Sequence, residues 1–244
     1  MITSDQMIAN LKQHANAQAV EGMARFGIRP VQAWGISMPT LRKMAKEIGR
    51  DQALAVALWN SGFREARILA SMIAEPQLVA AELMEEWVND VDAWDVCDQV
   101  CGNLFDKTPY AYQKAKEWCQ REKEFVRRAG FVMMAALAVH DKRARDEAFV
   151  QFFPLIKHYA GDERNFVKKA VNWALRQIGK RNSRLRACAL ECAYAIQDMD
   201  SKTARWVARV ALRELEAKEI KDEPAAYSRE RKAFRKHASR QEED

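Results

Sequence analysis

The sequence is poor in the residues that interrupt helices. Only 9 glycines and 6 prolines occur in 244 residues, and no run of alternating β-branched residues bounded by turns reads as a strand. Alanine, leucine, arginine, lysine and glutamate dominate the composition instead. Because these residues favour helices, and because a hydrophobic content of 48% is ample for a buried core, we expect an all-α protein.

Long apolar runs and sets of metal-binding residues are also missing. The longest apolar run, Ala129 to Val139, has about half of the ~20 residues that span a bilayer, and the first residues lack the pattern of a signal peptide. The five cysteines include no CxxC motif, and there are only four histidines. We therefore expect free thiols, a cytoplasmic location that includes the nucleoid, no membrane partner, and neither a metal nor another cofactor.

Charge is unevenly distributed along the chain, although the net charge is only +6. Residues 68–106 contain nine acidic residues and no lysine or arginine, whereas residues 164–190 contain eight basic residues and no acidic one. Such a basic segment is typical of a surface that binds a polyanion. The alternative is a solvated helix face whose counter-charges come from elsewhere in the fold.

Helical patterns follow one another along the chain with short breaks. Ser37, Pro39 and Gly49 frame one helix as its N-terminal cap, its early proline and its closing glycine. The other predicted helices cover residues 4–14, 17–26, 51–60, 63–74, 76–89, 92–106, 109–121, 124–140, 143–159, 163–180, 183–197 and 200–219. Helices of this length joined by short loops pack as antiparallel pairs in a bundle or a solenoid.

An internal repeat favours the solenoid. The sequence Phe-Val-Arg-Arg-Ala at 125–129 recurs 41 residues later as Phe-Val-Lys-Lys-Ala at 166–170, which agrees with the ~40–47 residue period of HEAT-type repeats. Residues 65–70 form a weaker copy. We predict one HEAT-like domain over residues 1–220, a curved right-handed superhelix of antiparallel helix pairs, followed by a flexible charged tail at 221–244.

Trp94 and Asp98 are the first candidates for a functional site. They lie four residues apart on the helix predicted at 92–106, so their side chains share one face, beside an apolar stripe. An aromatic ring next to a carboxylate is suited to holding a cation. A carboxylate so close to the core needs a partner, which is either a structural arginine or a positively charged ligand or reaction centre.

The helix predicted at 163–180 places a tryptophan among basic residues. Its apolar residues form one stripe that faces the core, and Trp173 falls with Lys169, Arg176 and Lys180 on the other side. A tryptophan among cations is suited to gripping a nucleic-acid backbone while stacking on a sugar or a base. In the alternative, Trp173 packs against a neighbouring helix and the basic side chains cover it.

Two arginines open the helix predicted at 124–140. Arg127 and Arg128 precede a segment that is apolar on all sides and is therefore expected to be deeply packed. An arginine at this position requires an anion. Its planar guanidinium group suits either a carboxylate, such as that of Asp98, or a phosphate group.

Together, these stretches resemble the AlkD-like DNA alkylation repair glycosylases, a family with HEAT-like repeats. The resemblance covers about residues 5–220. It is carried by Trp-Asp-Val-Cys-Asp at 94–98, Val-Arg-Arg at 126–128 and Lys-Lys-Ala-Val-Asn-Trp-Ala-Leu-Arg at 168–176. The resemblance implies a glycosylase that hydrolyses the N-glycosidic bond of positively charged N3- and N7-alkylated purines in double-stranded DNA without base flipping, leaving an abasic site. Because no lysine stands out as a Schiff-base nucleophile, we predict a monofunctional enzyme without a lyase step.

The resemblance also implies roles for single residues. The catalytic carboxylate falls on Asp98, and the two cleft tryptophans fall on Trp94 and Trp173. The phosphate-contacting arginine falls on Arg128, with Arg127 as the near alternative. Where the family has a tyrosine near the N-terminus, this sequence has Phe26, which keeps the ring and loses the hydroxyl group. Further DNA contacts are predicted at Arg127, Lys168, Lys169, Arg176, Lys180 and Arg181.

Two other functions are compatible with a helical repeat. One is a non-catalytic protein that binds damaged or branched DNA, but a pure binder gains nothing from a carboxylate at Asp98 near phosphates. The other is a scaffold for another protein, which needs no basic segment of the kind that surrounds Trp173. We therefore expect a monomeric enzyme that acts on alkylated double-stranded DNA without an obligate protein partner.

Overall fold

The computed structural model describes residues 2–28 and 32–217, and the regular structure within them is helical. The predicted tail at 221–244 and the last two residues of the helix predicted at 200–219 lie outside the described residues. The elements are α1 (Ser4–Gln13), α2 (Ala17–Met23), η1 (Ala24–Phe26), α3 (Met38–Ile48), α4 (Gln52–Asn60), α5 (Arg64–Ile73), η2 (Pro76–Leu78), α6 (Ala81–Asp90), α7 (Trp94–Asn103), η3 (Phe105–Lys107), α8 (Ala111–Trp118), α9 (Glu124–His140), α10 (Glu147–Val150), α11 (Phe153–His158), α12 (Asn165–Gly179), α13 (Ser183–Gln197) and α14 (Lys202–Ala217).

Most predicted helices are confirmed to within a few residues, and α3 shows why. The Ser37 side chain accepts the backbone N–H of Thr40, and Pro39 lies in the first turn. Gly49 ends the helix with a φ of 78°, a left-handed conformation that residues with a side chain rarely adopt. Local sequence therefore determines both ends of this helix.

Two predicted helices are wrong in part, and a proline explains the first difference. The region 143–159 contains α10 and α11 instead of one helix. Pro154 has no N–H group, and its ring excludes the carbonyl group of Val150 from a continuous helix. The helix predicted at 76–89 begins only at Ala81, after a short turn that starts with Pro76.

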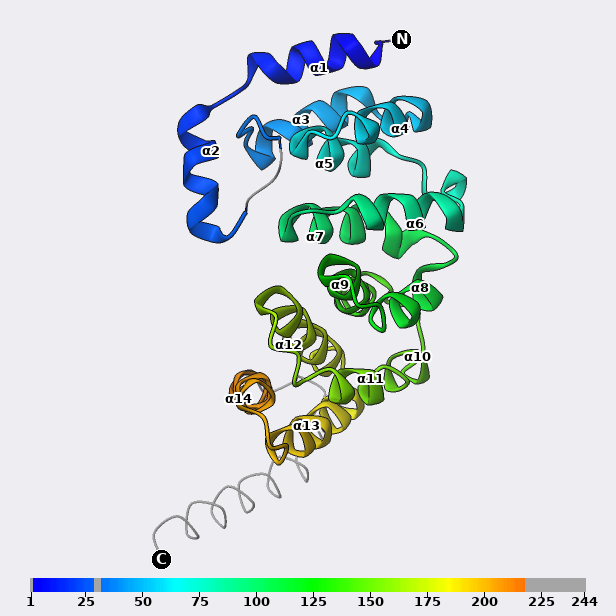
Figure 1. The fold of residues 1–244 in the computed structure, drawn as a ribbon. Coiled ribbons are helices and arrows are strands. Elements are labelled where there is room, and N and C mark those ends of the chain that lie inside the picture. The colour runs from blue at the N-terminus through cyan, green and yellow to red at the C-terminus, as the bar shows by residue number, and fades with distance from the viewer. Residues whose placement is uncertain (1, 29–31, 218–244) are drawn as a thin grey trace, which may run out of the picture.

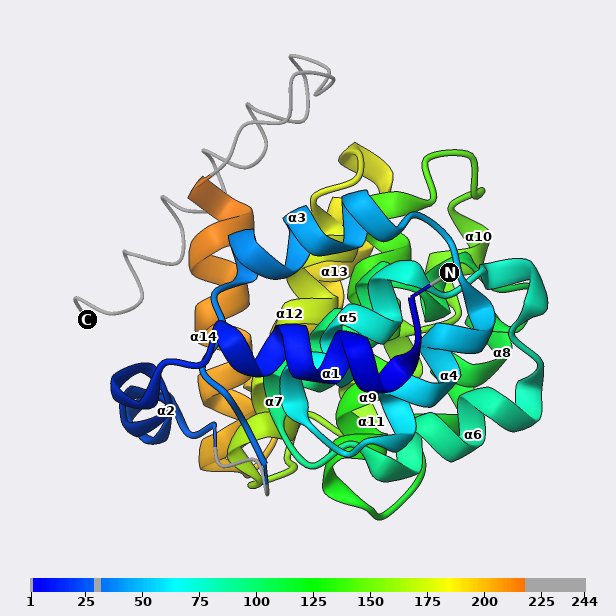
Figure 2. The ribbon, with the colours of Figure 1, turned by 90° about the horizontal axis from the view of Figure 1, so that it is seen from above.

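The helices form two rows that run along the molecule (Figure 1 and Figure 2). α3, α5, α7, α9, α12 and α14 pack one against the next in the first row, which we call the inner row. α4, α8 and α13 pack against α5, α9 and α14 from the second, outer row. Figure 1 shows the inner row bent into an arc, with α2 standing off its N-terminal end. This stacking of helix pairs confirms the predicted HEAT-like solenoid.

α9 is at the centre of the core. Residues 126–138 of this helix are buried except for Arg127, because α7, α8 and α12 pack around it. α8 comes so close that a Cβ atom on Gly130 would lie 2.2 Å from the backbone nitrogen of Cys119. Within the described chain, no helix combines the length and the hydropathy of a membrane span. All five cysteines are free thiols, as predicted.

Buried ion pairs connect successive helices of the inner row. Arg64 at the start of α5 contacts both its neighbour Glu65 and Asp95 of α7. Arg128 of α9 contacts Asp98 of α7 at 2.9 Å. A buried charge is tolerated only when it is paired, so these contacts determine how the helix ends meet at one edge of the arc.

Replacing Gly130 by alanine tests the packing of α8 against α9. The added Cβ meets backbone atoms, so we expect Gly130→Ala to lower the free energy of unfolding by ~3 kcal/mol, at the upper end of overpacking penalties. Gly22→Ala in α2 is the matched control because no atom lies within 4 Å of its Cβ position, and it should stabilise by about 0.5–1 kcal/mol. Urea unfolding followed by circular dichroism measures both, and equal stabilities contradict the close packing.

Candidate nucleic-acid interface

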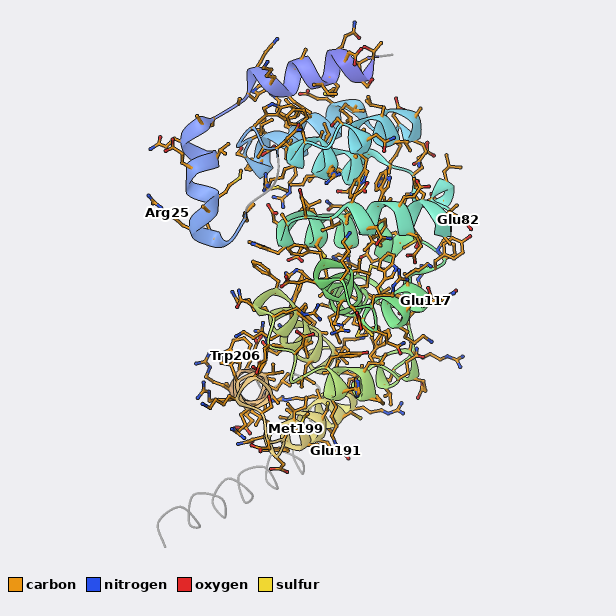
Figure 3. All side chains as sticks on the ribbon, in the orientation of Figure 1. Arg25, Glu82, Glu117, Glu191, Met199 and Trp206 are labelled. Carbon is orange, nitrogen blue, oxygen red and sulfur yellow. The ribbon has the colours of Figure 1, made fainter. Side chains whose placement is uncertain are left out.

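A cavity of about 490 Å³ lies at one edge of the arc. The turn after α2 and the N-terminal turns of α7, α9 and α12 surround it. The lining residues are Arg25, Phe26, Gly27, Trp94, Arg128, Asn165, Phe166 and Lys169. Figure 3 shows Arg25 on this side of the molecule and Glu82 and Glu117 on the other. The lining thus combines three aromatic rings with three basic side chains, and none of the described residues in it is acidic.

The turn after α2 is held in place by contacts to α7 and α12. The indole N–H of Trp94 donates a hydrogen bond to the carbonyl oxygen of Phe26 over 3.1 Å. Gly27 follows with a φ of 72°, and a Cβ atom there would lie 3.0 Å from the ring of Phe166. The backbone conformation therefore favours a glycine, and any larger residue would also have to displace the ring of Phe166 slightly. The ring of Phe26 itself remains 72% exposed.

Asp98 lies one turn after Trp94 on α7 and is bound by Arg128 of α9. The Nε and Nη2 atoms of Arg128 donate hydrogen bonds of 2.9–3.0 Å to the carboxylate. Nη1 donates to the carbonyl oxygen of Phe166 on α12 over 2.6 Å. The same guanidinium group lies 5.8 Å from the centre of the Trp94 ring. One arginine therefore joins three helices and sits beside both members of the predicted pair.

The surroundings of Asp98 raise the pKa of its carboxyl group. Burial leaves 18% of the side chain exposed and disfavours the charged form, whereas the ion pair with Arg128 favours it. Burial prevails and raises the pKa of Asp98 to about 6. Asp98 is not among the lining residues of the cavity, although its neighbours Trp94 and Arg128 are. The structural arginine considered as its partner is thus present, and a cation can approach only the exposed part of the carboxylate.

Trp173 does not line the cavity. It is partly buried and packs against the hydrophobic core, one helical turn beyond Lys169 and two turns beyond Phe166 on the same face of α12. Packing against the protein was the alternative considered for this residue. Phe166, which the sequence pattern assigns to the core stripe of the helix, is the aromatic residue of α12 that lines the cavity together with Trp94.

Arg127 is engaged in a structural ion pair. Its guanidinium group contacts Asp162 at 2.9 Å and lies 4.6 Å from the centre of the Tyr159 ring. Burial acts to raise the pKa of Asp162, but hydrogen bonds from Arg164 and Arg127 outweigh burial and lower it to about 2. The two consecutive arginines of α9 therefore bind different carboxylates.

Three of the predicted DNA contacts after residue 175 have partners within the protein. Arg176 and Lys180 form ion pairs with Glu214 of α14. Arg181 donates hydrogen bonds to the backbone carbonyl groups of Ala138 in α9 and Ala144 after it, and its guanidinium lies 4.1 Å from the ring centre of Phe149. At these positions the counter-charges do come from elsewhere in the fold, so a phosphate group has to compete with existing contacts.

Lys169 is available to a ligand. It is exposed, lines the cavity and forms no ion pair with the residues described here. Lys168 beside it covers the ring of Trp206, whose centre lies 5.4 Å from the ammonium nitrogen (Figure 3). Arg25 and Asn165 also line the cavity and were not predicted. Only their positions in the sequence point to them: Arg25 precedes Phe26, and Asn165 is the first residue of the basic helix α12.

The cavity is lined by basic side chains and aromatic rings, and the carboxylate of Asp98 lies behind them. Cations bind phosphate groups, and rings stack on bases or sugars. In the described ranges, no group of three or more histidine, cysteine, aspartate or glutamate side chains is placed to hold a metal ion. The chemistry that the side chains themselves provide is therefore phosphate binding, stacking and stabilisation of a positive charge by Asp98.

Comparison with known proteins identifies the family. The chain belongs to the DNA alkylation repair enzyme family, whose model matches residues 7–215, so the predicted family is confirmed. A solved structure described as "A new family of proteins related to the HEAT-like repeat DNA glycosylases with affinity for branched DNA structures" is similar, with a TM-score of 0.74 and 18% identity over 88% of this chain and 95% of that chain. At this identity the similarity establishes the fold. No curated protein matches the sequence.

Titration of Asp98 by carboxyl NMR tests the electrostatics of the site. We expect a midpoint near pH 6 in the wild type and a higher midpoint in Arg128→Met, because this substitution removes the charge that favours the carboxylate. Arg127→Met is the matched control: it should leave Asp98 unchanged and raise the pKa of Asp162 from about 2. A wild-type midpoint near the ordinary value of ~4, or equal shifts of Asp98 in both variants, contradicts the assigned pairs.

Proposed function

We propose that the protein is a monofunctional DNA glycosylase that removes N3- and N7-alkylated purines from double-stranded DNA without base flipping and leaves an abasic site. It acts as a monomer and without a cofactor. Membership in the DNA alkylation repair enzyme family supports a role in the repair of alkylated DNA. The observation that carries the catalytic part is Asp98, a partly exposed carboxylate with a raised pKa that lies behind Arg128 and Trp94, two residues that line the cavity.

The proposed role of Asp98 is to stabilise charge that develops on the sugar. An N3- or N7-alkylated purine is already positively charged, so the base leaves with the electron pair of the C1′–N bond and the deoxyribose gains oxocarbenium character. A fixed carboxylate stabilises this cation and positions the attacking water, whose proton passes to solvent. With a pKa of about 6, Asp98 is ionised at neutral pH, and Arg128 keeps its orientation.

Basic and aromatic side chains around the cavity supply the contacts to DNA. Arg25 and Lys169 are exposed and are placed to bind phosphate groups. The rings of Phe26 and Trp94 present faces against which a deoxyribose can pack. Contacts to phosphates and sugars, rather than to base edges, support a reaction in which the lesion stays outside a base-specific pocket.

Base release from duplex DNA that contains N7-methylguanine tests the role of Asp98. We expect Asp98→Asn to slow release by about 10²–10³-fold, because an amide carries no charge to balance the oxocarbenium ion. For the wild type, release above the spontaneous rate should rise with pH and reach half of its maximum near pH 6, since the carboxylate is the active form. Asp98→Asn should lose this pH dependence.

Glu82→Gln is the matched control for this experiment. It removes the same charge from an exposed position on the other side of the molecule (Figure 3), so it should release base at the wild-type rate. Wild-type release no faster than the spontaneous rate contradicts the enzyme function. Equal rates for the wild type and Asp98→Asn contradict the catalytic role of Asp98 alone.

A second candidate function is the binding of branched DNA without catalysis. Both carboxylate oxygens of Asp98 already accept hydrogen bonds from Arg128, and Phe26 lacks the hydroxyl group of a tyrosine. The protein in the similar solved structure is described as having affinity for branched DNA. In this case the cavity binds DNA, and the base-release assay gives no signal with either the wild type or Asp98→Asn.

The salt dependence of DNA binding tests the interface in both candidate functions. We expect log affinity for duplex DNA to fall with log salt concentration with a slope of about −4 to −7, as for roughly 5–8 neutralised phosphates. Lys169→Gln should make the slope less steep by about one unit. Lys157→Gln, at an exposed position of α11, should leave it unchanged. Fluorescence anisotropy between about 50 and 200 mM salt measures the slopes, and salt-independent binding removes the DNA-binding function.

A further inference from the structure

Phe26 is a large apolar side chain that the protein holds in water beside the cavity. Its exposed fraction of 72% is the highest among the described large hydrophobic residues, ahead of Leu78 at 58% and Tyr194 at 46%. Burying a phenylalanine ring is favourable, so a ligand that covers this exposed ring gains free energy of binding. The ring therefore marks a ligand-binding surface.

The backbone beneath Phe26 is fixed rather than loose. Trp94 donates its indole N–H to the Phe26 carbonyl oxygen over 3.1 Å, and Gly27 brings the turn against the ring of Phe166. The aromatic side chain is thus presented at one place relative to α7 and α12. A ring that is positioned before binding loses little conformational freedom when a ligand stacks on it.

The composition of the cavity indicates the chemical class of this ligand. Rings from Phe26, Trp94 and Phe166 lie among basic side chains, and a volume of about 490 Å³ falls in the ~300–1,000 Å³ range of sites for small molecules. Aromatic rings interleaved with cations bind unpaired nucleotides, because every base has an apolar face and every nucleotide carries a phosphate group.

Two of the basic side chains are free to hold the phosphate group. Arg128 is occupied by Asp98 and by a backbone carbonyl group. Arg25 and Lys169 line the same cavity, are exposed, and form no ion pair with any residue that the structure describes. The phosphate-binding role therefore falls on these two residues, one from the turn after α2 and the other from α12.

We infer that the cavity binds one unpaired nucleotide of bulged or branched DNA, with the base against Phe26 and the phosphate group at Arg25 and Lys169. A base inside a regular duplex is stacked on both faces, whereas an unpaired base leaves the stack at low cost. The inference rests on the proposed function for DNA binding. It adds a preference for a DNA structure, which hydrolysis of a lesion in a duplex does not require.

Two bulged duplexes isolate the contribution of the base. One carries a single unpaired deoxyadenosine, and the other carries a tetrahydrofuran abasic residue at the same position, so that charge and bend are matched. We expect the wild type to bind the adenine bulge about 10-fold more tightly than the abasic bulge, the size of one stacking contact. Phe26→Ala should bind both equally, and Phe26→Tyr, which keeps the ring, should retain the preference.

Leu78→Ala is the control, because it removes an exposed apolar side chain that is not part of the cavity lining and should keep the preference. Circular dichroism verifies that Phe26→Ala is folded. Equal binding of the two bulges by the wild type, or a preference that survives Phe26→Ala, overturns the nucleotide site and leaves salt-dependent duplex binding and base release intact. If the wild type binds no DNA at all, duplex included, both this site and the proposed function are overturned.

Discussion

The ion pair between Arg128 and Asp98 is the contact on which the site depends. Arg128 is 5% exposed, and its guanidinium group ties α9 to the carboxylate on α7 and to the Phe166 carbonyl group at the start of α12. A buried guanidinium group without an anion costs several kcal/mol. Asp98 therefore has a structural role in the packing of three helices, independent of any role in catalysis. The same pairing that orients the carboxylate also neutralises part of its charge, and a pKa of about 6 reflects the balance with burial.

The sequence predicts those features that depend on neighbours in the chain. The helix at 183–197 has the predicted bounds, and Asn182 before it caps its first turn by accepting the backbone N–H of Leu185. The need of Asp98 for an arginine also follows from sequence, since a carboxylate beside an apolar stripe requires a counter-charge. The error at Pro154 arises because periodicity was followed across a residue that cannot continue a helix, whereas the late start of α6 comes from the extended backbone at Val79 and Ala80.

The cavity could not be predicted because it depends on how far the superhelix turns between repeats. Phe26 meets Trp94 across 68 residues of chain, and a slightly different rotation per repeat would bring another face of α12 to the same edge. The position along α12 matters as well: Phe166 lies in the first turn, which reaches the cavity, whereas Trp173 lies two turns further along the same face. Long-range charge is hidden from sequence for the same reason: Glu214 pairs with Arg176 and Lys180 from a helix that follows the basic segment.

α2 has no buried residue, yet the turn that follows it supplies Arg25, Phe26 and Gly27 to the cavity. The stability of the fold resides in the two rows of helices, and exposed positions away from such packing tolerate substitution at little cost. Mutation can therefore change the ring and the cation at the cavity while the superhelix remains intact. In this segment, substitutions can thus alter what the cavity binds without altering the architecture that carries it.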